Sequence, residues 1–230
     1  MKKLGLCTAV ALSLSACAGG MNGGTSGNTI VTQYPVEAAM LNIYTKARSQ
    51  SLVATVGNQT ASADITVTPK GNMVFNNKQV QAAEVNTINK VNNQITDQSV
   101  AINYFTVNPL VFHGYTDSSG KYSLATQSTT LPKLATVGSS SQLIAEDVYA
   151  DRSMRKKIGS YKQGWSLVRD TNNTAWFCVD NSANLLLAND PNGTSSECYK
   201  INARVDILDS RVTINQPTTN GIKAIIFTSR

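Results

Sequence analysis

The stretch from residue 99 to residue 112 decides the fold, and it reads SVAINYFTVNPLVF. Val100, Ile102 and Tyr104 recur at every second position, which is the spacing of side chains on one face of a β-strand. Asn108-Pro109 interrupts the run, because proline has no N–H to donate to a neighbouring strand. Leu110 then begins a second apolar run. The stretch therefore predicts two strands joined by a turn.

Segments of the same kind lie on both sides of this stretch. Pro69-Lys70-Gly71-Asn72 separates two apolar runs, and Asp117-Ser118-Ser119-Gly120 forms a hairpin turn between Tyr115 and Tyr122. Residues 80–91 fit a strand or a helix, although their Asn and Thr content weakens the helix. About ten short strands divided by Gly, Asn and Pro turns are typical of all-β proteins. We expect a mostly β fold: an antiparallel sandwich, or a meander or half-barrel.

One segment, from about residue 35 to residue 50, has the period of a helix. Pro35 suits the first helical position, where its missing N–H costs nothing. Apolar residues then recur at spacings of three and four and form one stripe: Val36, Ala39, Met40, Ile43, Tyr44 and Ala47. A membrane-surface helix would carry a cationic face along most of its length, and this segment does not. We expect one N-terminal helix that packs on the sheet.

Residues 128–141 are rich in Ser, Thr, Gly and Pro, a composition typical of a connecting segment. We expect a β-rich domain over residues 34–230, with a division into two sub-domains near 128–141 as the alternative. No repeat with a period of roughly 20 to 50 residues stands out, which argues against a solenoid or a propeller.

The N-terminus has the three parts of an export signal. Met1-Lys2-Lys3 is positively charged, residues 4–14 are apolar, and Ser15-Ala16 are the small residues that a signal peptidase requires. The apolar run is about half as long as the roughly twenty residues that span a bilayer as a helix. Leu14-Ser15-Ala16-Cys17 matches the lipobox of bacterial lipoproteins at every position, and the chain resembles that class in these residues. The alternative is an ordinary secretory signal in which Cys17 has no role.

The lipoprotein resemblance implies where the mature chain would lie. Residues 1–16 would be removed as the signal peptide, and Cys17 would carry a diacylglyceryl thioether and a further acyl chain on its amine. Ala18 rather than Asp follows the cysteine, which by the sorting rule of Gram-negative lipoproteins implies the outer membrane. More than one acyl chain is needed for stable anchoring. Residues 17–33 begin with a run rich in Gly, Ser, Asn and Thr, so we expect a flexible tether.

The same resemblance leaves two cysteines for other roles. Cys7 would leave with the signal and Cys17 would be lipidated, so Cys178 and Cys198 remain. In an oxidising envelope such a pair predicts a disulfide. A reactive thiol or a metal ligand is the alternative, but a zinc site requires two further Cys or His ligands and the chain has only His113. We predict no metal site and no cofactor.

Catalytic machinery is hard to find in the sequence. His113 is the only histidine, so any Ser-His-Asp or Cys-His mechanism would have to use it. The pattern gives it no partner and contains no Gly-x-Ser-x-Gly elbow, so we assign no catalytic residue and predict no enzyme. Glu146 and Asp147 follow each other on one predicted strand and point to opposite faces. We expect both carboxylates to be solvated.

A basic run is the strongest local charge. Five cations and no acid occupy residues 152–162: Arg152, Arg155, Lys156, Lys157 and Lys162. Such a run could contact anionic lipid or an acidic envelope protein. The alternative is a solvated hairpin tip whose charges prevent pairing of strand edges. Because charged residues make up only 15% of the chain and the predicted location is outside the cytoplasm, we exclude nucleic acid as a partner.

Three functions from different classes fit these observations. We favour a non-enzymatic binding or scaffolding module of the cell envelope, anchored to the outer membrane through Cys17. A lipid or hydrophobic-ligand carrier, similar to half-barrel lipid-binding lipoproteins, would require a continuous apolar cavity between the helix and a curved sheet. An envelope hydrolase that uses His113 ranks last. Runs such as residues 104–109 resemble those of uncharacterised β-rich exported bacterial proteins, a likeness that implies no activity.

Overall fold

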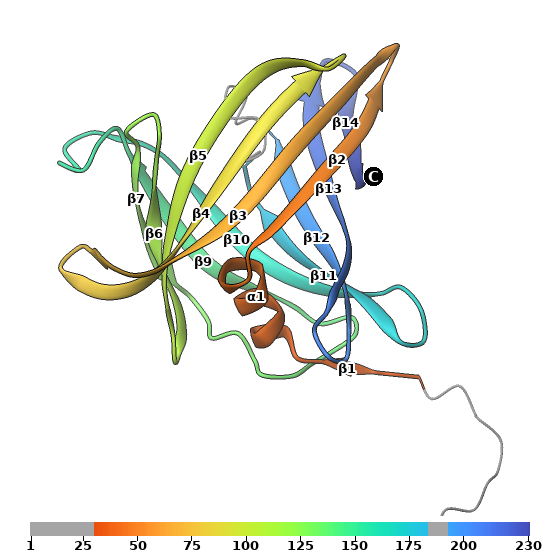
Figure 1. Cartoon of the computed structure of the whole chain (residues 1–230), viewed down its shortest axis with the longest axis horizontal. Helices are drawn as coiled ribbons and strands as arrows, with labels where there is room; N and C mark the ends of the chain where they lie inside the picture. Colours follow the sequence, from red (N-terminus) through yellow and green to blue (C-terminus); the bar gives the residue numbers. More distant parts are fainter. Residues whose placement is uncertain (1–29, 184–192) are drawn as a thin grey trace, which may run out of the picture.

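The computed structural model describes residues 30–183 and 193–230, and its main feature is a closed antiparallel β-barrel (Figure 1). Around the barrel the strands follow the order β10-β11-β12-β13-β14-β2-β3-β4-β5-β6-β7-β9. The prediction of a mostly β, antiparallel fold with one N-terminal helix is confirmed. The strands of the barrel have these bounds: β2 (Arg48–Val56), β3 (Gln59–Phe75), β4 (Lys78–Val91), β5 (Gln94–Val107), β6 (Leu110–Asp117), β7 (Tyr122–Gln127), β9 (Ser140–Tyr149), β10 (Lys157–Arg169), β11 (Thr174–Asn181), β12 (Thr194–Asn202), β13 (Ile207–Thr218) and β14 (Gly221–Ser229).

Each strand buries one face in the barrel and leaves the other outside. On β3 the apolar Ala63, Ile65 and Val67 are buried, whereas Asp64 and Thr66 between them lie on the outer face. This alternation follows from the period of two in a strand. The ring closes where Thr228 and Ser229 of β14 pair with β2. On β3 the inward face is therefore apolar and the outward face polar.

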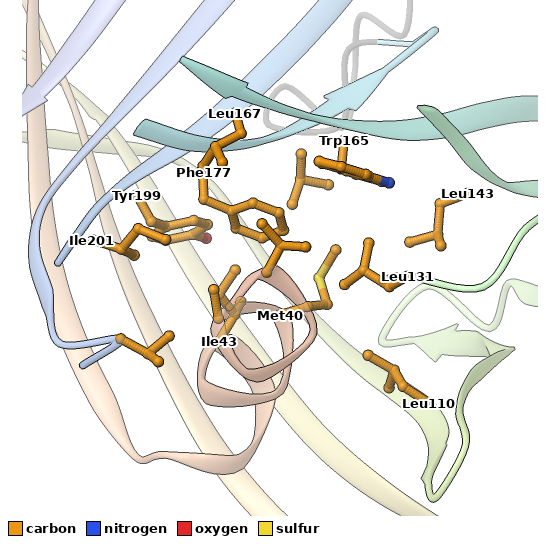
Figure 2. Close-up of a cluster of buried hydrophobic side chains, with 14 of the residues drawn as sticks. Met40, Ile43, Leu110, Leu131, Leu143, Trp165, Leu167, Phe177, Tyr199 and Ile201 are labelled. Atoms are coloured by element: carbon orange, nitrogen blue, oxygen red, sulfur yellow. The ribbon is translucent and has the colours of Figure 1, made fainter. Parts of the chain in front are cut away.

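The helix α1 (Val36–Thr45) lies at one end of the barrel and packs against its inner wall (Figure 1). Its buried side chains are those of the predicted stripe: Val36, Ala39, Met40 and Ile43. Figure 2 shows Met40 and Ile43 among Phe177, Tyr199 and Ile201 of the barrel wall. Within the described part of the chain, no helix is long and apolar enough to cross a membrane.

The helix is shorter than the predicted range of 35–50. The backbone is already extended at Lys46, and Arg48 begins β2, where it pairs with Val67 of β3. Hydrogen bonds to a neighbouring strand have replaced the last turn of helix, because tertiary pairing commonly overrides a weak local preference. The segment 80–91, which fitted either a strand or a helix, lies in β4.

Residues 128–141 connect two strands of the barrel. β7 and β9 lie on either side of this segment in the sequence and pair directly with each other, for example through Leu124 and Asp147. Within the segment, β8 (Ala135–Thr136) pairs with β1 (Gln33–Tyr34) to form a small second sheet near α1. The strands before and after residues 128–141 thus belong to one and the same barrel.

The predicted disulfide between Cys178 and Cys198 is present. The two residues lie directly opposite each other on β11 and β12. Their neighbours in the sequence, Phe177 and Tyr199, are buried in the barrel, so the disulfide lies on the outer face. It joins adjacent strands from outside and leaves the interior of the barrel free for other side chains.

Candidate ligand site inside the barrel

Side chains do not fill the whole interior of the barrel. Next to the C-terminal half of α1 lies a cavity of about 170 Å³. Ile43 and Tyr44 of α1 border it on one side, and inward-facing residues of the surrounding strands form its wall. We call this space the lumen cavity. Its lining contains both apolar side chains and several groups that can be charged, and this mixture makes it the candidate functional site.

One polar group in the wall centres on Glu146 of β9, which is buried and lines the cavity. Ser123 Oγ donates a hydrogen bond to Glu146 Oε1 at 2.6 Å, and the Tyr161 hydroxyl donates to Oε2. Burial raises the pKa of the Glu146 carboxyl above its usual value, although these two hydrogen bonds partly oppose the shift. The expectation that Glu146 is solvated was wrong, because the alternation of β9 turns it inward between Ile144 and Val148.

A second polar group is built on β2 and β12. Arg48 Nη2 donates a hydrogen bond to the Tyr199 hydroxyl at 3.1 Å, and that hydroxyl donates to Glu197 Oε2 at 3.2 Å. The guanidinium also lies over the Tyr199 ring, 4.7 Å from its centroid. Burial raises the pKa of Glu197 and raises that of Tyr199 to about 12. Tyr199 therefore stands as a neutral bridge between a cation and a carboxyl group.

Arg48 keeps hydrogen-bonding capacity that the described residues do not use. Its Nη1 donates to Gln50 Oε1 at 3.2 Å, and its buried Nε has no hydrogen-bond partner. Among the described residues, no carboxylate oxygen lies within 4.0 Å of the guanidinium. A guanidinium is always charged and offers five N–H donors in a planar fork. The lumen cavity thus contains a cation without a direct anionic partner.

The rest of the cavity wall is mixed, with the polar Thr87, Ser99, Asn103 and Gln163 beside several apolar side chains. Ile65 and Val67 of β3, Val85 of β4 and Ile144 of β9 all line it, as does the ring of Phe112. Tyr44 of α1 packs edge-on against that ring, with 5.4 Å between the ring centroids. Burial raises the pKa of the Tyr44 hydroxyl, so this group stays neutral. The site combines a wall of mixed polarity with the cation of Arg48.

The predicted basic run lies away from this cavity. Arg152, Arg155, Lys156, Lys157 and Lys162 are all exposed, at the β9–β10 connection and on the adjoining part of β10. Lys157 Nζ lies 2.7 Å from Asp147 on the outer face. Tyr161, within the same run, turns inward to Glu146. Contact of the exposed cations with an anionic partner stays a prediction.

His113 lies on β6, half-buried, between the cavity-lining residues Phe112 and Gly114, and points to the other face. Its buried Nε2 has no hydrogen-bond partner among the described residues. Burial, and secondarily the charge of Lys78, lowers its pKa. Residues 30–183 and 193–230 contain no group of three His, Cys, Asp or Glu side chains that could hold a metal ion.

Cys17, residues 1–16 and most of the predicted tether lie outside the described residues. The anchoring prediction therefore rests on the sequence. Comparison with known proteins does not extend it, since no family model, no curated protein and no solved structure matches the chain.

Proposed function

We propose that the chain is a non-enzymatic binding module of the cell envelope that holds a small amphipathic molecule in the lumen cavity. The observation that carries the proposal is a partly enclosed cavity that combines apolar side chains with a guanidinium that lacks a direct anionic partner among the described residues. Natural ligand sites have this composition, with many apolar side chains and a few well-placed polar groups. A core built for stability alone would pair or replace the buried charge.

The size of the cavity favours a small ligand over a membrane lipid. Its volume of about 170 Å³ is close to the roughly 150 Å³ of an apolar cavity that binds benzene. Sites for larger molecules usually measure about 300 to 1,000 Å³. The proposed carrier function therefore concerns a molecule with an apolar part about as large as a phenyl ring.

Filling the cavity with a side chain should abolish binding. Ala101 of β5 lines the cavity, whereas its neighbour Val100 points to the outer face. We expect Ala101→Phe to weaken the binding of benzyl alcohol by about tenfold or more, because the new ring occupies the space of the ligand. Saturation-transfer NMR titrations measure this affinity.

Val100→Phe is the matched control, since it adds the same ring on the other side of the same strand. It should bind benzyl alcohol as the wild type does. Equal affinities of the wild type and the Ala101→Phe variant, with both folded by circular dichroism, would rule out the cavity as the binding site.

The proposed envelope location follows from the lipobox that ends at Cys17. It predicts that the protein extracted from membranes begins at Cys17 and carries acyl chains there. Intact-mass spectrometry tests this directly. An unmodified N-terminus upstream of Cys17 would contradict the anchor without affecting the ligand site.

A further inference from the structure

We propose that the ligand is a small monocarboxylate whose carboxylate binds Arg48 beside the Tyr199 hydroxyl and whose apolar part lies against the wall of the lumen cavity. This inference rests on the proposed function and assigns a chemical class to the ligand. Three features carry it: the unused donors of Arg48, the charge balance around them, and the apolar side chains of the same cavity.

The donors of Arg48 match a carboxylate. The guanidinium has five N–H groups, and the described contacts occupy one on Nη1 and one on Nη2. The N–H on Nε and one further N–H on each Nη are left. Parallel N–H groups of a guanidinium bind the two oxygens of a carboxylate in a bidentate pair, which an ammonium group cannot do. The arrangement of these donors therefore favours a planar anion, such as a carboxylate, over a spherical anion such as chloride.

The charge balance around Arg48 also favours an incoming anion. Glu197 reaches the guanidinium only through the Tyr199 hydroxyl, and Glu146 is held by Ser123 and Tyr161. Burial raises the pKa of both carboxyl groups, which favours their neutral forms, whereas the guanidinium keeps its charge. The raised pKa values of both groups reduce the repulsion that a bound carboxylate would meet from them. A cationic ligand would instead meet the charge of Arg48.

Apolar side chains in the same cavity favour an apolar part in the rest of the ligand, and Val67 pairs directly with Arg48 across the strands. Ile65, Val67, Val85 and Ile144 present apolar side chains to the cavity. Thr87, Ser99, Asn103 and Gln163 also line the cavity and can hydrogen-bond a polar substituent on the ligand. A phenyl ring or a short alkyl chain gains from contact with the apolar side chains. The guanidinium of Arg48 and the apolar side chains of the cavity together favour a small aromatic or short-chain carboxylate.

Benzoate and benzyl alcohol form the test pair, because they share a ring and differ in the charged group. In saturation-transfer NMR titrations we expect the wild type to bind benzoate about tenfold or more tightly than benzyl alcohol. Arg48→Met should weaken benzoate binding about tenfold or more and remove this preference. Arg211→Met is the matched control: Arg211 lies on the outer face over the ring of Trp176, and its replacement should not change benzoate binding.

A second variant covers the case in which Arg48→Met does not fold. Tyr199→Phe keeps the ring under Arg48 but removes the hydroxyl beside the proposed carboxylate, and it should weaken benzoate binding about threefold to tenfold. Equal wild-type affinities for benzoate and benzyl alcohol would overturn the carboxylate inference. So would a benzoate preference that survives in Arg48→Met, or an unchanged benzoate affinity in Tyr199→Phe. The carboxylate inference can fail while the proposed function holds. In that case the wild type still binds benzyl alcohol, and Ala101→Phe still abolishes that binding.

Discussion

Replacing Phe177 by alanine should lower the free energy of unfolding by about 3–5 kcal/mol, the usual cost of removing a buried aromatic side chain. Phe177 on β11 is fully buried, and its ring lies 6.4 Å from that of Trp165 between centroids. It belongs to the cluster in which α1 meets the barrel wall (Figure 2). Its loss creates a void beneath the helix that rigid strands cannot close. Urea unfolding monitored by circular dichroism measures the difference.

Val168→Ala is the control for this experiment. Val168 on β10 lies opposite Trp176 on the outer face and is 48% exposed, so its truncation should change the free energy of unfolding by less than about 0.5 kcal/mol. A loss below about 1 kcal/mol in Phe177→Ala would mean that the helix and the wall are not packed as described.

Removing the disulfide should have the second largest effect. The double variant Cys178→Ala and Cys198→Ala should lose about 3 kcal/mol, because a cross-link over a sequence separation of 20 residues restricts the unfolded chain. The strands β11 and β12 remain paired in the folded state, so the fold should persist. Urea unfolding of the oxidised wild type and the double variant gives the difference.

A reducing agent provides the control for the disulfide prediction. It should destabilise the wild type to the level of the double variant and leave the double variant unchanged. If the double variant is within about 0.5 kcal/mol of the oxidised wild type, the bond does not contribute through the unfolded chain as argued.

The strands could be predicted from the sequence, but the closure of the barrel could not. Alternation in segments such as residues 99–107 reports a strand with two different faces, and a sandwich, a meander and a barrel share this pattern. Closure depends on Thr228 and Ser229 meeting Val53 and Leu52, which lie near the other end of the described chain. No local pattern records such a pairing, because it depends on the number, tilt and stagger of all the strands.

The residues of the site could not be predicted from the sequence, for reasons that the structure makes clear. Arg48 falls within residues 35–50, for which the sequence predicts a helix rather than a strand with an inner face. Glu146 stands at an inward position between Ile144 and Val148, and this break in the alternation was the available signal. The disulfide offered another, since Cys198 on the outer face places Glu197 and Tyr199 inside. Prediction of the site therefore requires knowing which face of each strand points into the barrel.

The most direct test of the central claim locates a bound ligand inside the barrel. Nuclear Overhauser effects between the ring protons of benzoate and the methyl groups of the protein report which side chains lie next to the ligand. The account predicts contacts with Ile43, Val67, Val85 and Ile144, which line the lumen cavity. Contacts confined to methyl groups on the outer face, such as those of Ile226 and Val168, would contradict it.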